Sequence, residues 1–124
     1  MLKKYAGIAL FTLATLAAGP LLAHEGAAAK HGGIVQTASD LSFELVAGPQ
    51  DTLIYIEDHG QPMAPTGMSG KLTILKGTEK TEAPLTVADD KLEAKGVTLT
   101  KGSKVVANLN TAQQKAITVR FTVK

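Results

Sequence analysis

Residues 41–58, Leu-Ser-Phe-Glu-Leu-Val-Ala-Gly-Pro-Gln-Asp-Thr-Leu-Ile-Tyr-Ile-Glu-Asp, decide the fold of this chain. Apolar and polar side chains largely alternate over residues 41–47, which is the period of a strand with one buried face. Residues 48–51 (Gly-Pro-Gln-Asp) are typical of a turn. Residues 52–58 are apolar on both faces, which indicates a central strand covered on both sides. The stretch therefore predicts two consecutive β-strands.

The same pattern of short alternating runs and turn signals continues to the end of the chain, without a segment of helical period. Further strands are expected at residues 34–37, 71–76, 81–88, 91–95, 104–110 and 117–123, with a brief extended piece at 97–99. Turns at this spacing are typical of a β-sandwich. We expect an all-β fold: a single small antiparallel β-sandwich, immunoglobulin-like or cupredoxin-like, with seven or eight short strands over residues 31–124.

Two residue types predict positions within this fold. Pro84 has no N–H group to donate to a ladder, so it suggests that its strand lies at the edge of a sheet. Phe43, Tyr55 and Phe121 are the only Phe or Tyr residues beyond the N-terminal segment, and we expect them to pack together in the core.

The N-terminal segment has the three parts of a secretory signal peptide. Lys3 and Lys4 are followed by an uncharged, mostly apolar run over residues 5–22 and by the small residue Ala23. A membrane anchor is the alternative, because a spanning helix needs about 20 apolar residues. Gly and Pro at positions 19–20 would interrupt such a helix, so we favour a signal peptide that is cleaved.

Cleavage after Ala23 determines the organisation of the rest, with residues 27–29 as a later alternative site. The expected parts are a signal peptide (1–23), a flexible N-terminal lead (24–30) and the β-sandwich domain (31–124) of a periplasmic protein that has no membrane anchor. The net charge of +2 falls to zero because the signal peptide carries two lysines. Because the mature chain has no net positive charge, we expect no electrostatic attraction to nucleic acid or to anionic membrane surfaces.

Several function classes lack their motifs. The chain has no cysteine, which excludes disulfides, a lipid-anchored cysteine and a blue-copper centre. Residues 67–70 (Gly-Met-Ser-Gly) do not match the G-x-S-x-G pattern of a nucleophile elbow, and no Gly-rich phosphate loop occurs. The adjacent carboxylates of Glu57 and Asp58 would point to opposite faces of a strand, and Asp89 and Asp90 read as a turn. We predict that the protein is not an enzyme.

Histidine and methionine supply a weak metal signal. His24 would become the N-terminal residue, where the ring and the α-amine together chelate Cu(II). His31 and His59 are candidate ligands as well, because imidazole is a common metal ligand in proteins. The thioethers of Met63 and Met68 suit Cu(I) or Ag(I). These five residues are the predicted site for a copper or silver ion. Each also has a plain structural alternative, as a tail residue, a turn residue or a loop residue that folds back onto the core.

Five runs of sequence resemble a known group of proteins. The runs are 31–33 (HGG), 43–46 (FELV), 53–62 (LIYIEDHGQP), 92–96 (LEAKG) and 119–123 (VRFTV). They resemble small periplasmic proteins of proteobacteria and the N-terminal segment of periplasmic adaptor subunits of heavy-metal efflux pumps. The resemblance implies a β-rich module near the export of copper, silver, zinc or cobalt. The long α-hairpin and the lipoyl-like and barrel domains of an adaptor are missing, so bridging a pump to an outer-membrane channel is not expected.

We therefore expect a non-catalytic periplasmic protein that binds heavy metal or assists metal tolerance, with copper or silver as the most plausible ion. The alternative is a metal-independent interaction module that docks on an efflux or envelope partner through an edge strand or through residues 57–70.

Overall fold

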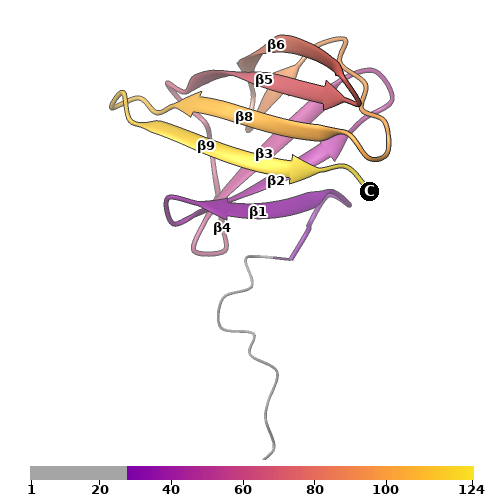
Figure 1. The fold of residues 1–124 in the computed structure, drawn as a ribbon. Helices are drawn as coiled ribbons and strands as arrows, with labels where there is room; N and C mark the ends of the chain where they lie inside the picture. The colour runs from indigo at the N-terminus through magenta and orange to yellow at the C-terminus, as the bar shows by residue number, and fades with distance from the viewer. Residues whose placement is uncertain (1–27) are drawn as a thin grey trace, which may run out of the picture.

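The computed structural model describes residues 28–124, and these form an all-β domain (Figure 1). The predicted signal peptide (1–23) and His24 lie outside the described residues. The strands are β1 (Ile34–Ala38), β2 (Leu41–Ala47), β3 (Thr52–Asp58), β4 (Gln61–Met63), β5 (Ser69–Lys76), β6 (Glu79–Ala88), β7 (Lys91–Ala94), β8 (Lys104–Asn110) and β9 (Ala116–Thr122). The all-β prediction is confirmed. Over residues 28–124 there is no helix that could cross a membrane.

All strand pairs are antiparallel and form one sheet in the order β1-β2-β3-β7-β6-β5-β8-β9, with β4 paired to β3. The long strand β6 joins the two halves of the sheet: residues 79–85 pair with β5, and residues 86–88 pair with β7. The sheet curls around its core into a nearly closed, barrel-like arrangement, and the two end strands β1 and β9 lie next to each other.

One strand more than expected is present, because the chain after β3 returns at once as β4. His59 and Gly60 both have positive φ (51° and 81°), which is the backbone geometry of a tight two-residue hairpin turn. Ile56 then pairs with Met63 and Asp58 with Gln61. The sequence predicts a long loop here, because residues 61–63 are too short a run to show a period.

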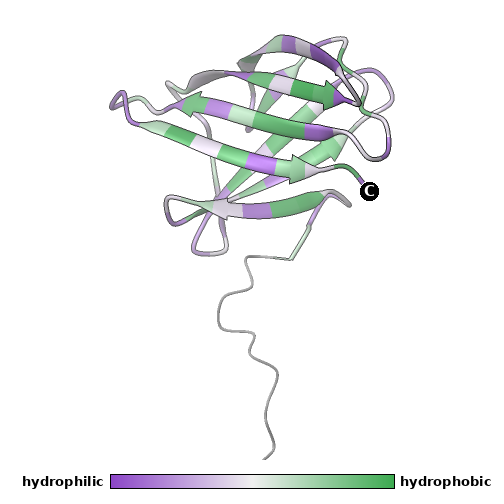
Figure 2. Cartoon of the chain, viewed as in Figure 1, coloured by the Kyte–Doolittle hydropathy of each residue, from purple (hydrophilic) through white to green (hydrophobic). Residues whose placement is uncertain are grey.

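The core lies between the two halves of the sheet and follows the alternation of the sequence, as the banded strands of Figure 2 show. Phe43 and Phe121 are buried in it, as expected. Tyr55 is not in the core, which corrects the prediction that the three rings pack together. Ile54 and Ile56 point into the core, so Tyr55 between them points to the outer face of β3 and is only half-buried.

The prediction that Pro84 lies on an edge strand holds for its own part of the strand but not for the strand as a whole. Its strand, β6, lies inside the sheet between β5 and β7. Because β7 pairs only with Thr86–Ala88, the part of β6 that holds Pro84 has a strand on one side alone among the described residues. A residue without an N–H group is tolerated there because no second ladder requires one.

Candidate functional site

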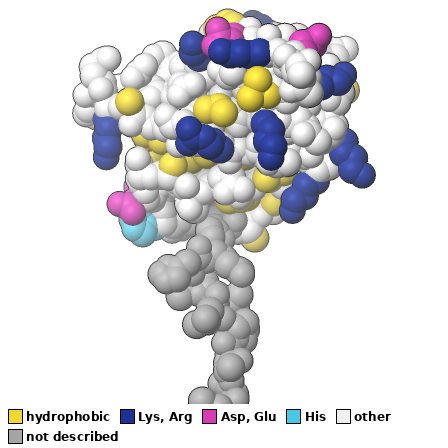
Figure 3. Space-filling model, viewed as in Figure 1, with side chains coloured by type: hydrophobic (Ala, Val, Ile, Leu, Met, Phe, Trp, Pro, Cys, Tyr) yellow, Lys and Arg dark blue, Asp and Glu magenta, His cyan; other side chains and the backbone are white. Residues whose placement is uncertain are grey.

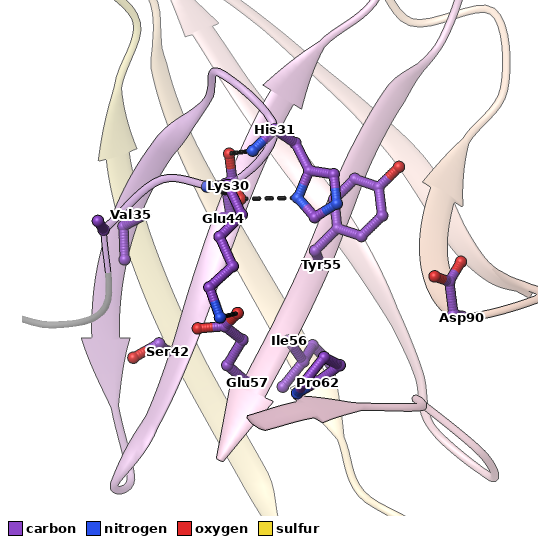
Figure 4. Close-up of a pocket in the computed structure, with 11 residues that line it drawn as sticks. Lys30, His31, Val35, Ser42, Glu44, Tyr55, Ile56, Glu57, Pro62 and Asp90 are labelled. Atoms are coloured by element: carbon purple, nitrogen blue, oxygen red, sulfur yellow. Dashed lines mark hydrogen bonds and ion pairs between the residues drawn. The ribbon is translucent and has the colours of Figure 1, made fainter. Parts of the chain in front are cut away.

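The chain before β1 (residues 28–33, the crossing segment) crosses the outer face of β2 and β3, where the carboxylate of Glu44 holds its backbone (Figure 4). Glu44 accepts hydrogen bonds from the backbone N–H groups of Lys30 (3.1 Å), His31 (2.8 Å) and Gly33 (2.8 Å). Glu44 lies on the outer face because its neighbours Phe43 and Leu45 point into the core, yet it is only 6% exposed. The crossing segment buries this carboxylate and satisfies it.

The same carboxylate orients the imidazole of His31. His31 Nδ1 lies 2.9 Å from Glu44 Oε1, and the ring stacks on Tyr55 with 3.6 Å between centroids and 5° between planes. The His31 side chain remains 41% exposed. A carboxylate that accepts from one ring nitrogen and leaves the other available is the usual arrangement around a metal-binding imidazole. A purely structural ion pair is the plain alternative.

A second contact fastens the crossing segment further along β3. Lys30 Nζ lies 2.6 Å from Glu57 Oε2 and donates to the carbonyl of Gly60 at 3.1 Å. Lys30 is the last residue of the predicted flexible lead (24–30), so the contacts of the domain begin one residue before the predicted boundary. The other oxygen of this carboxylate, Glu57 Oε1, is buried and has no hydrogen-bond partner among the described residues.

These contacts enclose a pocket of about 190 Å³ on the outer face of the sheet. Figure 4 shows the His31–Tyr55 pair on one side and the Lys30–Glu57 pair on the other, with Pro62 below the two rings and beside Glu57. Glu57 lines this pocket, so a donor or cation in it would lie beside a carboxylate that has one oxygen without a partner among the described residues.

The pKa of Glu44 lies below the usual value of 4.5. Burial is the largest single influence and raises the pKa. The hydrogen bonds from the His31 ring and from the backbone of Gly33, His31 and Lys30 favour the ionised form, and together they outweigh burial. An ionised carboxylate can only accept, so Nδ1 of His31 is the donor in this contact and Nε2 is the ring nitrogen that it leaves available.

Glu44→Gln is therefore expected to lower the free energy of unfolding by about 1–3 kcal/mol at pH 7. The folded pKa is lowered, so the contribution of the carboxylate is complete above the unfolded value of about 4.5 and is lost as pH falls through the folded pKa. Urea denaturation in steps from pH 7 to acid should show the two proteins converging.

Glu79→Gln is the matched control, because Glu79 is exposed and its substitution should change the free energy of unfolding by less than about 0.5 kcal/mol. A difference between wild type and Glu44→Gln that stays constant down to acid pH would show that the carboxylate charge is not what holds the segment.

The structure does not bring the five predicted metal ligands together. His31 lies in the pocket, whereas His59 sits in the β3–β4 turn with Nδ1 2.6 Å from Asp58 Oδ1 and its side chain 85% exposed. Met63 packs against the core and Met68 is buried in it, while His24 is outside the described residues.

Distance along the sheet also separates the two described histidines. His31 stacks on Tyr55, and His59 follows Asp58, which is three residues further along β3 or about 10 Å. In residues 28–124 no group of three or more His, Cys, Asp or Glu side chains could hold a metal ion. A metal ion bound at His31 would therefore have part of its coordination sphere open to water.

Sequence reasoning missed the partners of His31, namely Glu44, Tyr55 and the Lys30–Glu57 pair. Period-two alternation was the available signal for two of them, because it places Glu44 and Tyr55 on the outer face, where the register makes them direct neighbours.

Comparison of the chain with protein-family models, with curated proteins and with solved structures gives no match. The resemblance to efflux adaptor segments therefore stays a prediction from the sequence. Function has to be argued from the geometry of the site.

Proposed function

We propose that this chain is a non-catalytic periplasmic protein that binds copper at His31 and assists metal tolerance or efflux. The observation that carries the proposal is the fixed imidazole: Glu44 holds Nδ1 at 2.9 Å, and Tyr55 supports the ring face. A ring held in this way needs little reorganisation when Nε2 binds a metal.

The donor set of the site favours Cu(II) over Cu(I) and Ag(I). The soft thioethers are removed from the site, since Met68 is buried in the core and Met63 packs against it. Among the residues that line the pocket with His31, Glu57 and Asp90 carry carboxylate oxygens, and the lining contains no sulfur ligand. Imidazole and oxygen donors suit Cu(II) better than monovalent soft ions. His24 remains the sequence-predicted further donor, from the segment that leads directly to His31.

Titration of the mature protein with Cu(II) tests the proposal. Wild type is expected to bind more tightly than about 10 μM, and His31→Ala at least tenfold more weakly, or about 1.4 kcal/mol. His59→Ala is the matched control, because its ring is exposed and pairs only with Asp58, and it should bind as wild type does. Absence of Cu(II) binding would contradict the copper role, and equal binding by His31→Ala would contradict the site.

Docking on an envelope partner without metal is a second candidate function. It is favoured by the end strands β1 and β9, each of which pairs with a single strand among residues 28–124 and so offers an unpaired edge. Removal of metal by a chelator would leave such a role intact and would abolish the first.

A further inference from the structure

The barrel-like sheet is open between its end strands. A cleft of about 650 Å³ lies there, lined by residues of β1 and β9 and by the neighbouring ends of β5 and β8. Gln36 lies opposite Phe43, on the side of β1 that faces the core, yet it is exposed. On β8 and β9, by contrast, the lining residues Val106 and Arg120 alternate with core residues, so the cleft extends over the outer face of these strands.

The charged side chains that line the cleft are all basic. Lys104, Arg120 and Lys124 line it, no acidic residue does so among the described residues, and none of the three cations forms an ion pair within residues 28–124. In the view of Figure 3, Lys and Arg side chains surround apolar atoms in the middle of the face, while Asp and Glu side chains lie at its upper and left margins. Charge on the mature chain sums to zero but is unevenly distributed.

Between these cations the lining is apolar. Val35 and Val106 are half-buried, and Leu75 is one of two large apolar side chains that the described surface leaves exposed. A bare phosphate or an extended polyanion would gain nothing from such a floor. An amphipathic protein segment would bury it.

The backbone of β9 offers hydrogen bonds on this side. Val123 accepts from the N–H of Gly102 and donates to the carbonyl of Ser103, so its polar groups face the β8 side. Backbone groups alternate in direction along an antiparallel strand. Those of Arg120 and Thr122 consequently face away from β8, toward the cleft.

We propose that this cleft binds an extended, acidic segment of a partner protein. Its carboxylates would pair with Lys104, Arg120 and Lys124, and its apolar side chains would cover Val106 and Leu75. Because β1 lies next to β9, the segment would run across β9, β8 and β5, and its main chain would meet the unpaired backbone groups of β9 where it crosses that strand. The inference goes beyond copper binding and does not depend on it, and it gives the docking role a partner of stated chemistry.

Fluorescence anisotropy with a short labelled peptide that alternates glutamate and valine tests this directly. Wild type is expected to bind the peptide, and Arg120→Glu to bind it at least tenfold more weakly, because one of the three cations of the cleft is replaced by an anion. Lys95→Glu is the control: it makes the same change of net charge at an exposed position after β7, away from the strands of the cleft, and should bind as wild type does. A lysine–valine peptide should not bind.

Three results would overturn the proposal. They are equal binding by Arg120→Glu, no binding of the acidic peptide by wild type, and displacement of the peptide by inorganic phosphate, phosphatidylglycerol vesicles or an oligonucleotide at comparable concentration. His31→Ala should retain full peptide binding, so that failure of the copper site and failure of the cleft are distinguished. Arg120 is exposed, and an unchanged circular dichroism melt would verify that its replacement leaves the fold intact.

Discussion

Gly33→Ala is expected to weaken Cu(II) binding at least tenfold and to lower the free energy of unfolding by about 1–3 kcal/mol. A Cβ atom at this position would lie 2.3 Å from the carbonyl oxygen of Leu45, which is a backbone atom inside the β2 ladder and has little room to move. The crossing segment must then lift from β2. It would take with it the Gly33 N–H bond to Glu44 and the contact between Glu44 and the His31 ring.

Gly32→Ala separates this effect from a general effect of glycine replacement. A Cβ atom at Gly32 would meet nothing within 4 Å, but the residue has a φ of +72°, so alanine there should cost about 1 kcal/mol of backbone strain. Cu(II) affinity should stay close to that of wild type. Urea denaturation and Cu(II) titration of both variants give the comparison, and a Gly33→Ala protein that binds copper normally would contradict the account of the crossing segment.

Phe43→Ala should cause the largest loss of stability, about 3–5 kcal/mol. Phe43 is fully buried, and it is the residue before Glu44 on β2, so a cavity there would undermine the strand that holds the site. The chain has no cysteine and hence no disulfide to limit the damage. The total free energy of unfolding of a domain of this size is only about 5–15 kcal/mol.

Chemical denaturation followed by tyrosine fluorescence measures this loss. Val87→Ala is the control, since Val87 is among the exposed apolar residues and its truncation should cost less than about 0.5 kcal/mol. A Phe43→Ala protein within about 1 kcal/mol of wild type would mean that the core does not depend on this ring.

Alternation was sufficient to predict most of the strands, because a buried face imposes period two wherever a strand is longer than about four residues. It failed at β4, where three residues including Pro62 show no period. It also failed to fix the neighbours of β6, since pairing depends on contacts between segments distant in sequence. The prediction that Tyr55 lies in the core was based on the general preference of aromatic rings for the core. Its position between Ile54 and Ile56, which both point inward, is the stronger signal and places the ring on the outer face.

For the site, the sequence predicted His31 but not the residues that surround it. The sequence predicted soft thioether ligands from the loop after His59. Met68 of that loop cannot serve as one, because its side chain is buried in the core. The residues that orient His31 are carboxylate and aromatic groups 13 and more positions away in the chain. They meet only because the chain before β1 crosses β2 and β3, and that crossing leaves no local pattern in the sequence.

The central claim is that the oriented imidazole of His31 binds Cu(II). Two-dimensional amide NMR of residues 24–124 with sub-stoichiometric Cu(II) tests it most directly, because paramagnetic broadening falls steeply with distance from the ion. The account predicts that the signals of His31, Glu44 and Tyr55 disappear first and that those of β6, such as Thr81, persist. Broadening centred on His59, broadening confined to residues before Lys30, or an unchanged spectrum would contradict it.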